Sequence, residues 1–208
     1  MCIIVAKPAN TKMPSQEIIS RCFYRNPDGA GFMYSKNGKV RIRKGFMTLS
    51  DFNKALEELS TQINMTATPI VMHFRIGTGG GNIPANTHPY PVNDNLKLLQ
   101  SLNTKTDLGV VHNGIIDIRP RQKDINDTME YIMSQLAPLK RAVPNFYENA
   151  DLVQMIKNAI TSKMAFLTTD GRIYTIGEFM EEDGILYSND TYKPYSTKYL
   201  GTYWSSPK

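Results

Sequence analysis

The chain has 208 residues and a formal net charge of +5, from 24 lysines and arginines against 19 aspartates and glutamates. This length suits one domain of ordinary size, so residues 1–208 are expected to form a single domain. No run approaches the ~20 apolar residues that cross a membrane. No secretory leader pattern opens the chain, so we expect a cytoplasmic protein without a membrane partner. The modest, scattered positive charge gives no reason to expect a nucleic-acid partner.

The first expected element is a short buried strand over residues 3–6, which are apolar and mostly β-branched. It places Cys2 at the end of a central strand. Once Met1 is removed, Cys2 carries a thiol and a free α-amine. Because an α-amine titrates near ~8, it can serve at neutral pH as the base for its own thiol. The alternative interpretation is that Cys2 is a small buried hydrophobic residue. Cys2 and Cys22 alone do not predict a disulfide framework.

The first half of the chain alternates helix and strand signals. A helix is expected over residues 17–24, followed by a turn-rich segment and a hairpin whose Asn37-Gly38 pair is a strong turn signal. The basic run at residues 39–44 is interpreted as a solvated strand face. A second helix, with Ser50 as its N-cap, has Phe52, Ala55, Leu56 and Leu59 on its inner side.

The middle of the chain contains a second apolar strand, expected over residues 70–76, which delivers Arg75 into the triglycine loop 79–81. Such a loop suits a lid or a close approach to a ligand. It lacks the lysine of a phosphate-binding loop, so phosphate binding is not expected. Residues 93–106 are expected to form a short helix or an excursion. A third strand, residues 108–111, ends on His112-Asn113-Gly114.

The second half begins with two amphipathic helices, expected over residues 124–136 and 147–160. The second of these has Leu152, Met155, Ile156 and Ala159 inward. Strands are then expected over residues 164–169, 172–176 and 184–188. Strands at both ends of the chain, with paired helices between them, predict an α+β domain of packed antiparallel sheets.

Several segments, taken in order, match one family pattern. They are CIIV at residues 2–5, RNPDGAG at 25–31, HFRIGT at 73–78, NTHP at 86–89, HNGII at 112–116 and NDT at 126–128. Together they resemble the glutaminase domain of class II glutamine amidotransferases, which belong to the N-terminal nucleophile hydrolases. The resemblance spans residues 2–136 and, more loosely, 164–188. It implies a four-layer α-β-β-α sandwich of two antiparallel sheets.

The resemblance also implies a reaction. The Cys2 thiol attacks the side-chain amide of glutamine, a γ-glutamyl thioester forms, and glutamate and ammonia are released without a cofactor. The Asn113 side chain and the Gly114 backbone N–H then stabilise the oxyanion, a role worth about 3–4 kcal/mol per donor. From these two residues alone, a tight turn is the preferred interpretation of Asn113-Gly114.

Five further residues are expected to bind substrate. Arg75 offers a two-pronged donor for the α-carboxylate of glutamine, with a structural ion pair as the alternative. Asp127 is matched to the family residue that holds the α-ammonium; without that match, a first-turn helix carboxylate is the preferred interpretation. Thr78 and His88 lie in matched segments, and Arg25 is expected close to Cys2. No metal site is expected, because the spacings of the three histidines do not resemble a ligand motif; they are interpreted as satisfied structural residues.

The chain departs from the family pattern at several points. Ile3 stands where the family usually has glycine, Asn26-Pro27 precedes Asp28 in the turn, and residues 93–106 are an addition. No second domain that would consume ammonia is expected, so an amidotransferase would need a separate acceptor protein near residues 79–81. Two alternatives remain: an amidohydrolase of the same fold with another γ-glutamyl or amide substrate, and a non-catalytic binding or regulatory relative.

Overall fold

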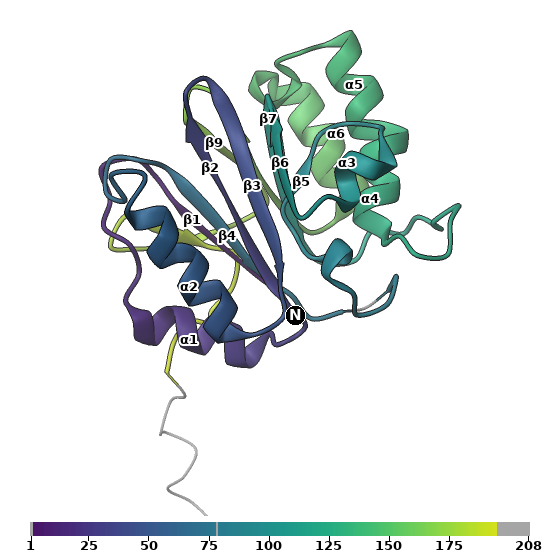
Figure 1. Ribbon diagram of the computed structural model, residues 1–208. Coiled ribbons are helices and arrows are strands. Elements are labelled where there is room, and N and C mark those ends of the chain that lie inside the picture. The colour runs from purple at the N-terminus through teal and green to yellow at the C-terminus, as the bar shows by residue number, and fades with distance from the viewer. Residues whose placement is uncertain (1, 78, 195–208) are drawn as a thin grey trace, which may run out of the picture.

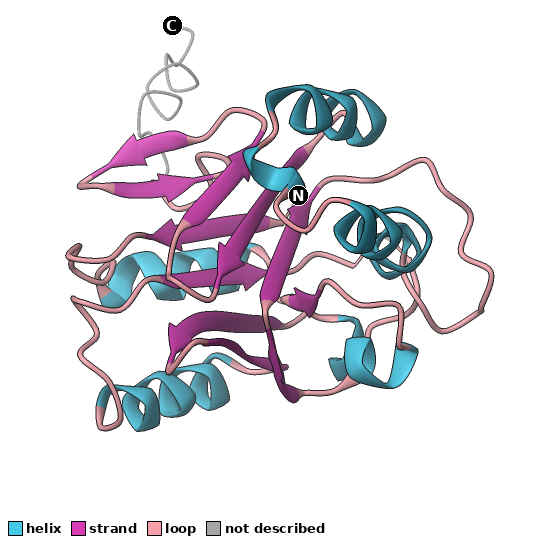
Figure 2. Cartoon of the chain, turned by 90° about the horizontal axis from the view of Figure 1, so that it is seen from above, coloured by secondary structure: helices cyan, strands magenta, loops and turns pink. Residues whose placement is uncertain are grey.

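The computed structural model describes residues 2–77 and 79–194. These residues form an α+β protein with two antiparallel sheets, of seven and four strands (Figure 1). Seen from above, the helices lie around the outside of the strands (Figure 2). Within the described part of the chain, no helix has the length and apolar character that a bilayer-spanning segment needs.

The larger sheet has the strand order β10-β11-β1-β4-β2-β3-β6. Its strands are β1 (Ile3–Lys7), β2 (Ala30–Lys36), β3 (Lys39–Phe46), β4 (Ile70–Phe74), β6 (Asn103–Thr106), β10 (Met180–Glu182) and β11 (Ile185–Tyr187). The helices α1 (Gln16–Arg25) and α2 (Leu49–Ser60) share one apolar cluster with this sheet, in which Phe52 is in ring contact with Phe32 and Phe74. Both helices therefore cover one face of the larger sheet.

The smaller sheet has the order β5-β7-β8-β9. Its strands are β5 (Tyr90–Pro91), β7 (Leu108–Asn113), β8 (Lys163–Thr168) and β9 (Ile173–Ile176). A second apolar cluster joins this sheet to α4 (Asp127–Tyr131), to the π-helical turn η2 (Ile132–Leu136) that continues it, and to α6 (Ala150–Ile160). The remaining helical pieces are α3 (Leu96–Gln100), α5 (Ala137–Ala142), η1 (Pro84–Asn86) and η3 (Phe146–Glu148).

A third apolar cluster lies between the two sheets. Ile4, Ala6 and Val71 of the larger sheet pack against Val111, Ala165 and Leu167 of the smaller one. Because side chains alternate along a strand, Ile3 and Val5 of β1 point instead to the helices. The strand β1 is thus buried on both faces, which explains its unbroken apolar sequence. Its position between β11 and β4 fixes the place of Cys2 at its end.

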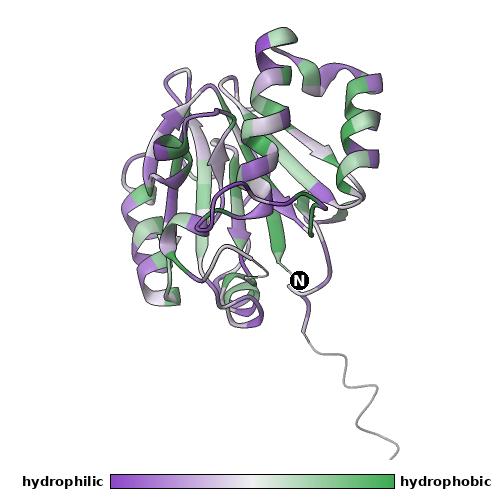
Figure 3. Ribbon diagram, turned by 90° about the vertical axis from the view of Figure 1, so that its right-hand side faces the viewer, coloured by the Kyte–Doolittle hydropathy of each residue, from purple (hydrophilic) through white to green (hydrophobic). Residues whose placement is uncertain are grey.

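Most of the expected elements are confirmed. The strand at residues 3–6, the first helix, the hairpin with its Asn37-Gly38 turn and the strands of the second half are all present. Positive φ angles of 53° and 66° at Asn37 and Gly38 agree with the turn that this pair predicts. Figure 3 shows apolar and polar residues alternating along the helices, as amphipathic helices require.

Some expectations were wrong in detail. The N-cap of α2 is Thr48, whose hydroxyl accepts a hydrogen bond from the Asp51 N–H, and not Ser50. The last long helix begins at Ala150, and its Met155 is exposed, so the inward stripe is narrower than expected. Lys44 is buried, with its Nζ donating to two backbone carbonyls. The basic run at residues 39–44 is therefore solvated only in part, because alternation places Lys44 on the inward face of β3.

Candidate active site

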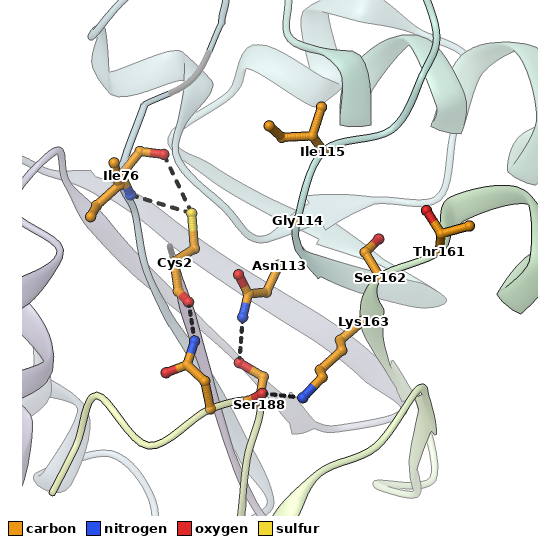
Figure 4. A pocket seen from close by; sticks show the side chains of 10 residues that line it. Cys2, Ile76, Asn113, Gly114, Ile115, Thr161, Ser162, Lys163 and Ser188 are labelled. Carbon is orange, nitrogen blue, oxygen red and sulfur yellow. Dashed lines mark hydrogen bonds between the residues drawn. The ribbon is translucent and has the colours of Figure 1, made fainter.

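A cavity of about 440 Å³ opens at the end of β1. Its walls come from segments that are far apart in the sequence: Cys2 before β1, the end of β7, the turn before β8, and the residues that follow β11 (Figure 4). The lining includes Cys2, Asn113, Gly114, Ser162, Lys163 and Ser188. The structure therefore brings together all three residues that the sequence predicted to be catalytic.

The thiol of Cys2 lies against Ile76, which follows β4. The Ile76 N–H donates to Sγ at 3.3 Å, and the Ile76 carbonyl lies 3.4 Å from the same sulfur. Burial raises the pKa of the Cys2 thiol above its ordinary value, although the Ile76 N–H partly opposes this. Since the raised pKa keeps the thiol protonated at neutral pH, a nucleophilic Cys2 needs a base close by.

Asn113 and Gly114 form the facing wall, where β7 ends. The Asn113 Nδ2 donates to the Ser188 hydroxyl at 2.8 Å. Gly114 has a φ of +151°, and a Cβ at this position would lie 2.3 Å from the Cβ of Ser162. Residue 114 must therefore be glycine for the wall to keep this shape, and its small size leaves the backbone open to the cavity.

Ser188 and Asn189 belong to this site, although the sequence analysis did not find them. The Ser188 hydroxyl accepts from the Ile4 N–H at 2.8 Å, and the Ser188 N–H donates to the Ile4 carbonyl at 3.0 Å. The Asn189 Nδ2 donates to the Cys2 carbonyl at 2.7 Å. The end of the last strand thus clamps the start of the first, a long-range pairing whose only sequence signal is the expected strand at residues 184–188.

Lys163 also lines the cavity, at the start of β8. Its Nζ donates to the Ser188 carbonyl at 2.5 Å. Among the described residues that line the cavity, Lys163 has the only side chain that is charged at neutral pH. The cavity therefore has a positive rather than a negative character.

A second hydroxyl in the cavity, that of Ser162, is paired with a histidine. The His112 Nε2 lies 2.7 Å from the Ser162 Oγ, and the His112 Nδ1 lies 3.0 Å from the Thr128 Oγ1. Burial lowers the pKa of His112 to about 4, although the charge of Asp127 opposes the shift. A histidine with this pKa is neutral at pH 7 but is a weak base, so it activates a serine poorly.

Arg75 does not line this cavity. Its side chain is 3% exposed and binds the triglycine loop, with Nη1 donating to the Asn82 Oδ1 at 3.2 Å and Nη2 to the Gly79 and Gly81 carbonyls at 3.0 and 3.2 Å. No carboxylate among the described residues pairs with Arg75, so the structural ion pair is not what the structure shows. The guanidinium instead holds the loop that follows β4.

Asp127 is likewise occupied by the protein itself. It is the first residue of α4, and its carboxylate accepts from the Ile116 N–H at 2.7 Å and from the Thr128 N–H at 2.8 Å. It therefore acts both as a first-turn helix carboxylate and as the anchor of the loop that follows Gly114. Asp127 does not line the cavity beside Cys2.

His88 lies in the interior, away from the cavity. Its ring contacts those of His73 and Tyr90, with centroid separations of 4.2 and 4.6 Å. Neither of its nitrogens has a hydrogen-bond partner among the described residues. The expectation that all the histidines have hydrogen-bond partners was therefore wrong for His88. Its neighbours in the sequence do not indicate which groups surround the ring in the fold.

A chain of hydrogen bonds through Thr191 and Asn189 connects Arg25 to Cys2. Its Nη1 donates to the Thr191 carbonyl at 3.0 Å, and the Thr191 N–H donates to the Asn189 Oδ1, whose amide nitrogen binds the Cys2 carbonyl. Arg25 therefore supports the segment that holds Cys2 without lining the cavity. Thr78, the remaining candidate, lies outside the described residues.

The described residues contain no cluster of three or more histidine, cysteine, aspartate or glutamate side chains that is suited to a metal ion. No protein-family model matches the chain, and a search of curated proteins gives no significant match. The cavity brings together the thiol of Cys2, the side-chain amide of Asn113, the backbone of Gly114 and the amino group of Lys163.

Proposed function

We propose that this protein is an amidohydrolase that cleaves the side-chain amide of glutamine, using Cys2 as an N-terminal nucleophile. The observation that carries the proposal is the shared cavity of Cys2, Asn113 and Gly114. A thiol that shares a cavity with a side-chain amide and a glycine backbone has the groups that acyl transfer through a thioester requires. The order of segments that resembles class II glutamine amidotransferases supports the same chemistry.

The reaction follows from the groups present. After removal of Met1, the α-amine of Cys2 takes the thiol proton, a step made necessary by the raised pKa of the thiol. The thiolate attacks the amide carbon, and the new oxyanion is stabilised by the Gly114 N–H and the Asn113 side-chain amide. The α-ammonium of Cys2 then gives its proton to the departing ammonia, and water hydrolyses the γ-glutamyl thioester to glutamate.

The architecture supports this assignment. One pair of helices covers the outer face of the larger sheet, an apolar layer joins the two sheets, and other helices cover the smaller sheet. We infer that this order is the four-layer α-β-β-α sandwich of N-terminal nucleophile hydrolases. In that arrangement a first strand in the middle of one sheet presents residue 2 at its end, as β1 does.

Substrate recognition requires a change of hydrogen-bond partners. Glutamine binding by Arg75 and Asp127 requires these side chains to exchange their present partners, the loop carbonyls and the Ile116 N–H, for the substrate's charged groups. The runner-up is an amidohydrolase that acts on a different amide. It is favoured by Lys163, which lines the cavity and can pair with an anionic group of another substrate. In an amidotransferase, a separate protein would receive the ammonia.

The first experiment measures intact mass and glutamate release on one purified sample, beside the variants Cys2→Ala and Cys22→Ala. Cys22 is the matched control, since it is a buried cysteine in the core between α1 and the sheet. We expect loss of Met1, activity in the Cys22 variant and none in the Cys2 variant. Retention of Met1, or equal activity in both variants, would refute the role of Cys2.

A second measurement separates glutamine from the runner-up substrates. Hydrolysis rates are compared for glutamine, asparagine, glutamine blocked at its α-carboxylate, and a γ-glutamyl anilide. A strong preference for unblocked glutamine supports recognition by Arg75. Faster cleavage of the blocked or anilide substrates supports the alternative amidohydrolase. No hydrolysis of any amide after removal of Met1 would support a non-catalytic binding protein.

A further inference from the structure

Only one end of the Asn113 side-chain amide has a hydrogen-bond partner among the described residues. Its Nδ2 donates to the Ser188 hydroxyl, whereas its Oδ1 is buried and has no partner among the described residues. In Figure 4 this oxygen lies on the side of Cys2 and the nitrogen on the side of Ser188. A buried amide oxygen without a donor carries a desolvation cost of about 1–3 kcal/mol.

The Ser188 hydroxyl has the opposite defect, because it accepts hydrogen bonds and donates none within the described residues. It accepts two hydrogen bonds, from the Ile4 N–H and from the Asn113 Nδ2, each at 2.8 Å. No hydrogen bond donated by this hydroxyl is found within the described part of the chain, although a serine hydroxyl has one proton to give. The unpartnered oxygen and the unused proton belong to neighbouring side chains.

A half-turn of the Asn113 amide gives Oδ1 a donor and the Ser188 proton an acceptor, and leaves Nδ2 as the group without a protein partner. It brings Oδ1 to the place from which Nδ2 now contacts Ser188, and the Ser188 O–H then donates to it while still accepting from the Ile4 N–H. The amide nitrogen and oxygen exchange places with almost no change of shape. After the turn, Nδ2 faces the cavity beside Cys2, where a substrate oxyanion would need a donor.

We propose that Ser188 is the positioning residue that sets the orientation of the Asn113 amide, by donating its hydroxyl proton to Oδ1 and so directing Nδ2 toward the cavity. The effect of Ser188 on catalysis rests on the proposed function, whereas the orientation of the Asn113 amide can be tested without it. Ser188 acts through Asn113 and touches no reacting atom.

The surroundings of Ser188 suit this role. Its N–H is bonded to the Ile4 carbonyl and its own carbonyl accepts from the Lys163 Nζ, so its backbone is held from two strands, β1 and β8. The side chain is fully buried. Because Ile4 lies two residues from Cys2, one hydroxyl ties the strand of the nucleophile to the donor on the facing wall.

The kinetic test is a double-mutant cycle with Ser188→Ala, Asn113→Ala and both together. We expect Ser188→Ala to lower kcat about tenfold with KM within about twofold, and to have less than about a twofold effect when Asn113 is already alanine. Equal effects of Ser188→Ala in both backgrounds would overturn the inference, because Ser188 would then act independently of Asn113. The alkylation rate of Cys2 by iodoacetamide is the structural control, and we expect it to change less than about twofold.

The orientation is tested separately by neutron crystallography of the trimmed wild-type protein after exchange into heavy water. We expect deuterium on the Ser188 Oγ to point at the Asn113 Oδ1, and the two amide deuterons to lie on the side of Cys2. Amide deuterons on the side of Ser188 would overturn the inference whatever the activity. A wild-type protein that shows the expected orientation but hydrolyses no amide would instead overturn the proposed function alone. This measurement also decides the question if Ser188→Ala does not fold.

Discussion

The two halves of the predicted site differ in how their side chains are used. Around Cys2, the residues expected to perform chemistry line an open cavity of about 440 Å³. Around Arg75 and Asp127, the groups expected to bind substrate are bonded to the protein's own loops. The first region presents a thiol and a glycine backbone to the cavity and bonds the Asn113 amide to Ser188, whereas the second uses its charges to hold residues 79–82 and 116 in place.

This difference agrees with the different demands on groups that stabilise a transition state and groups that bind a substrate. The groups that stabilise a transition state must be fixed before substrate arrives, because reorganisation during the reaction lowers their value. Groups that recognise a substrate can first hold a loop and then exchange it for the ligand, as lids do. In the described structure, Arg75 is bonded to the loop. The following predictions test whether the two regions differ in this way.

The largest expected effect belongs to the cavity. Replacing Asn113 by alanine removes the side-chain donor, and we expect kcat for glutamine to fall about 100–1000-fold with little change in KM. Steady-state kinetics measure the effect, with Asn158→Ala on the exposed side of α6 as the control. A rise in KM at constant kcat would show that Asn113 binds the substrate and does not stabilise the transition state, which would contradict the difference between the two regions.

Gly114→Ala is expected to damage the cavity wall itself. The new Cβ would lie 2.3 Å from Ser162 at a φ of +151°, whereas at Gly38, with a φ of +66°, no atom lies within 4 Å. We expect Gly114→Ala to lower the free energy of unfolding by about 3 kcal/mol and Gly38→Ala by about 1 kcal/mol. Urea denaturation of the two variants decides the matter, and equal losses would contradict the close packing at Gly114.

The next prediction concerns the loop-bound region. Arg75→Lys keeps the charge but loses the two-pronged geometry, so we expect KM for glutamine to rise about 30-fold with kcat nearly unchanged. Asn82→Ala, which removes one of the loop contacts of Arg75 but not the guanidinium, is the matched control. A similar rise in KM for both variants would show that Arg75 serves the loop only.

The last prediction concerns the buried histidines of the interior. Burial lowers the pKa of His73 to about 3 and that of His112 to about 4, so both are neutral in the folded protein at pH values where the unfolded chain binds protons. Stability is therefore complete above pH ~6.5 and falls as the pH drops toward 4, by at most about 1.4 kcal/mol per pH unit for each histidine. Urea titrations between pH 7 and 4 should show this slope, and His73→Gln should make it shallower. An unchanged slope would contradict the burial of a neutral His73.

Local patterns in the sequence were enough to predict much of the fold. The apolar run of β1, the Asn37-Gly38 turn and the helical spacing of α1 and α2 each depend on neighbouring residues. The position of Lys44 was also readable, since it shares the inward face of β3 with Val40 and Ile42. The π-helical turn η2 was not predicted from the helical spacing of residues 124–136, although Pro138, which has no N–H to bond the carbonyl of Ser134, lies just after it at the start of α5.

In the site, too, the residues that local patterns indicate were predicted, and those that depend on long-range pairing were not. Cys2, Asn113 and Gly114 were predicted because each closes or opens a strand and lies in a recognisable motif. Ser188 and Asn189 were missed because their roles arise only when the last hairpin pairs with the first strand. The loop-bound condition of Arg75 was missed for a related reason: three separate oxygen acceptors on residues 79–82 converge on one guanidinium, and no local pattern predicts that.

The position of β1 between β4 and β11 also has a consequence for the order in which the protein is made. A ribosome adds ~5–20 residues per second, so β11 emerges on the order of ten seconds after β4. Until then Ser188 and Asn189 cannot bond to Ile4 and Cys2, as they do in the finished fold. The start of the chain therefore lacks these two contacts throughout most of translation, which leaves an interval in which an aminopeptidase can remove Met1 before Cys2 is bonded to Asn189.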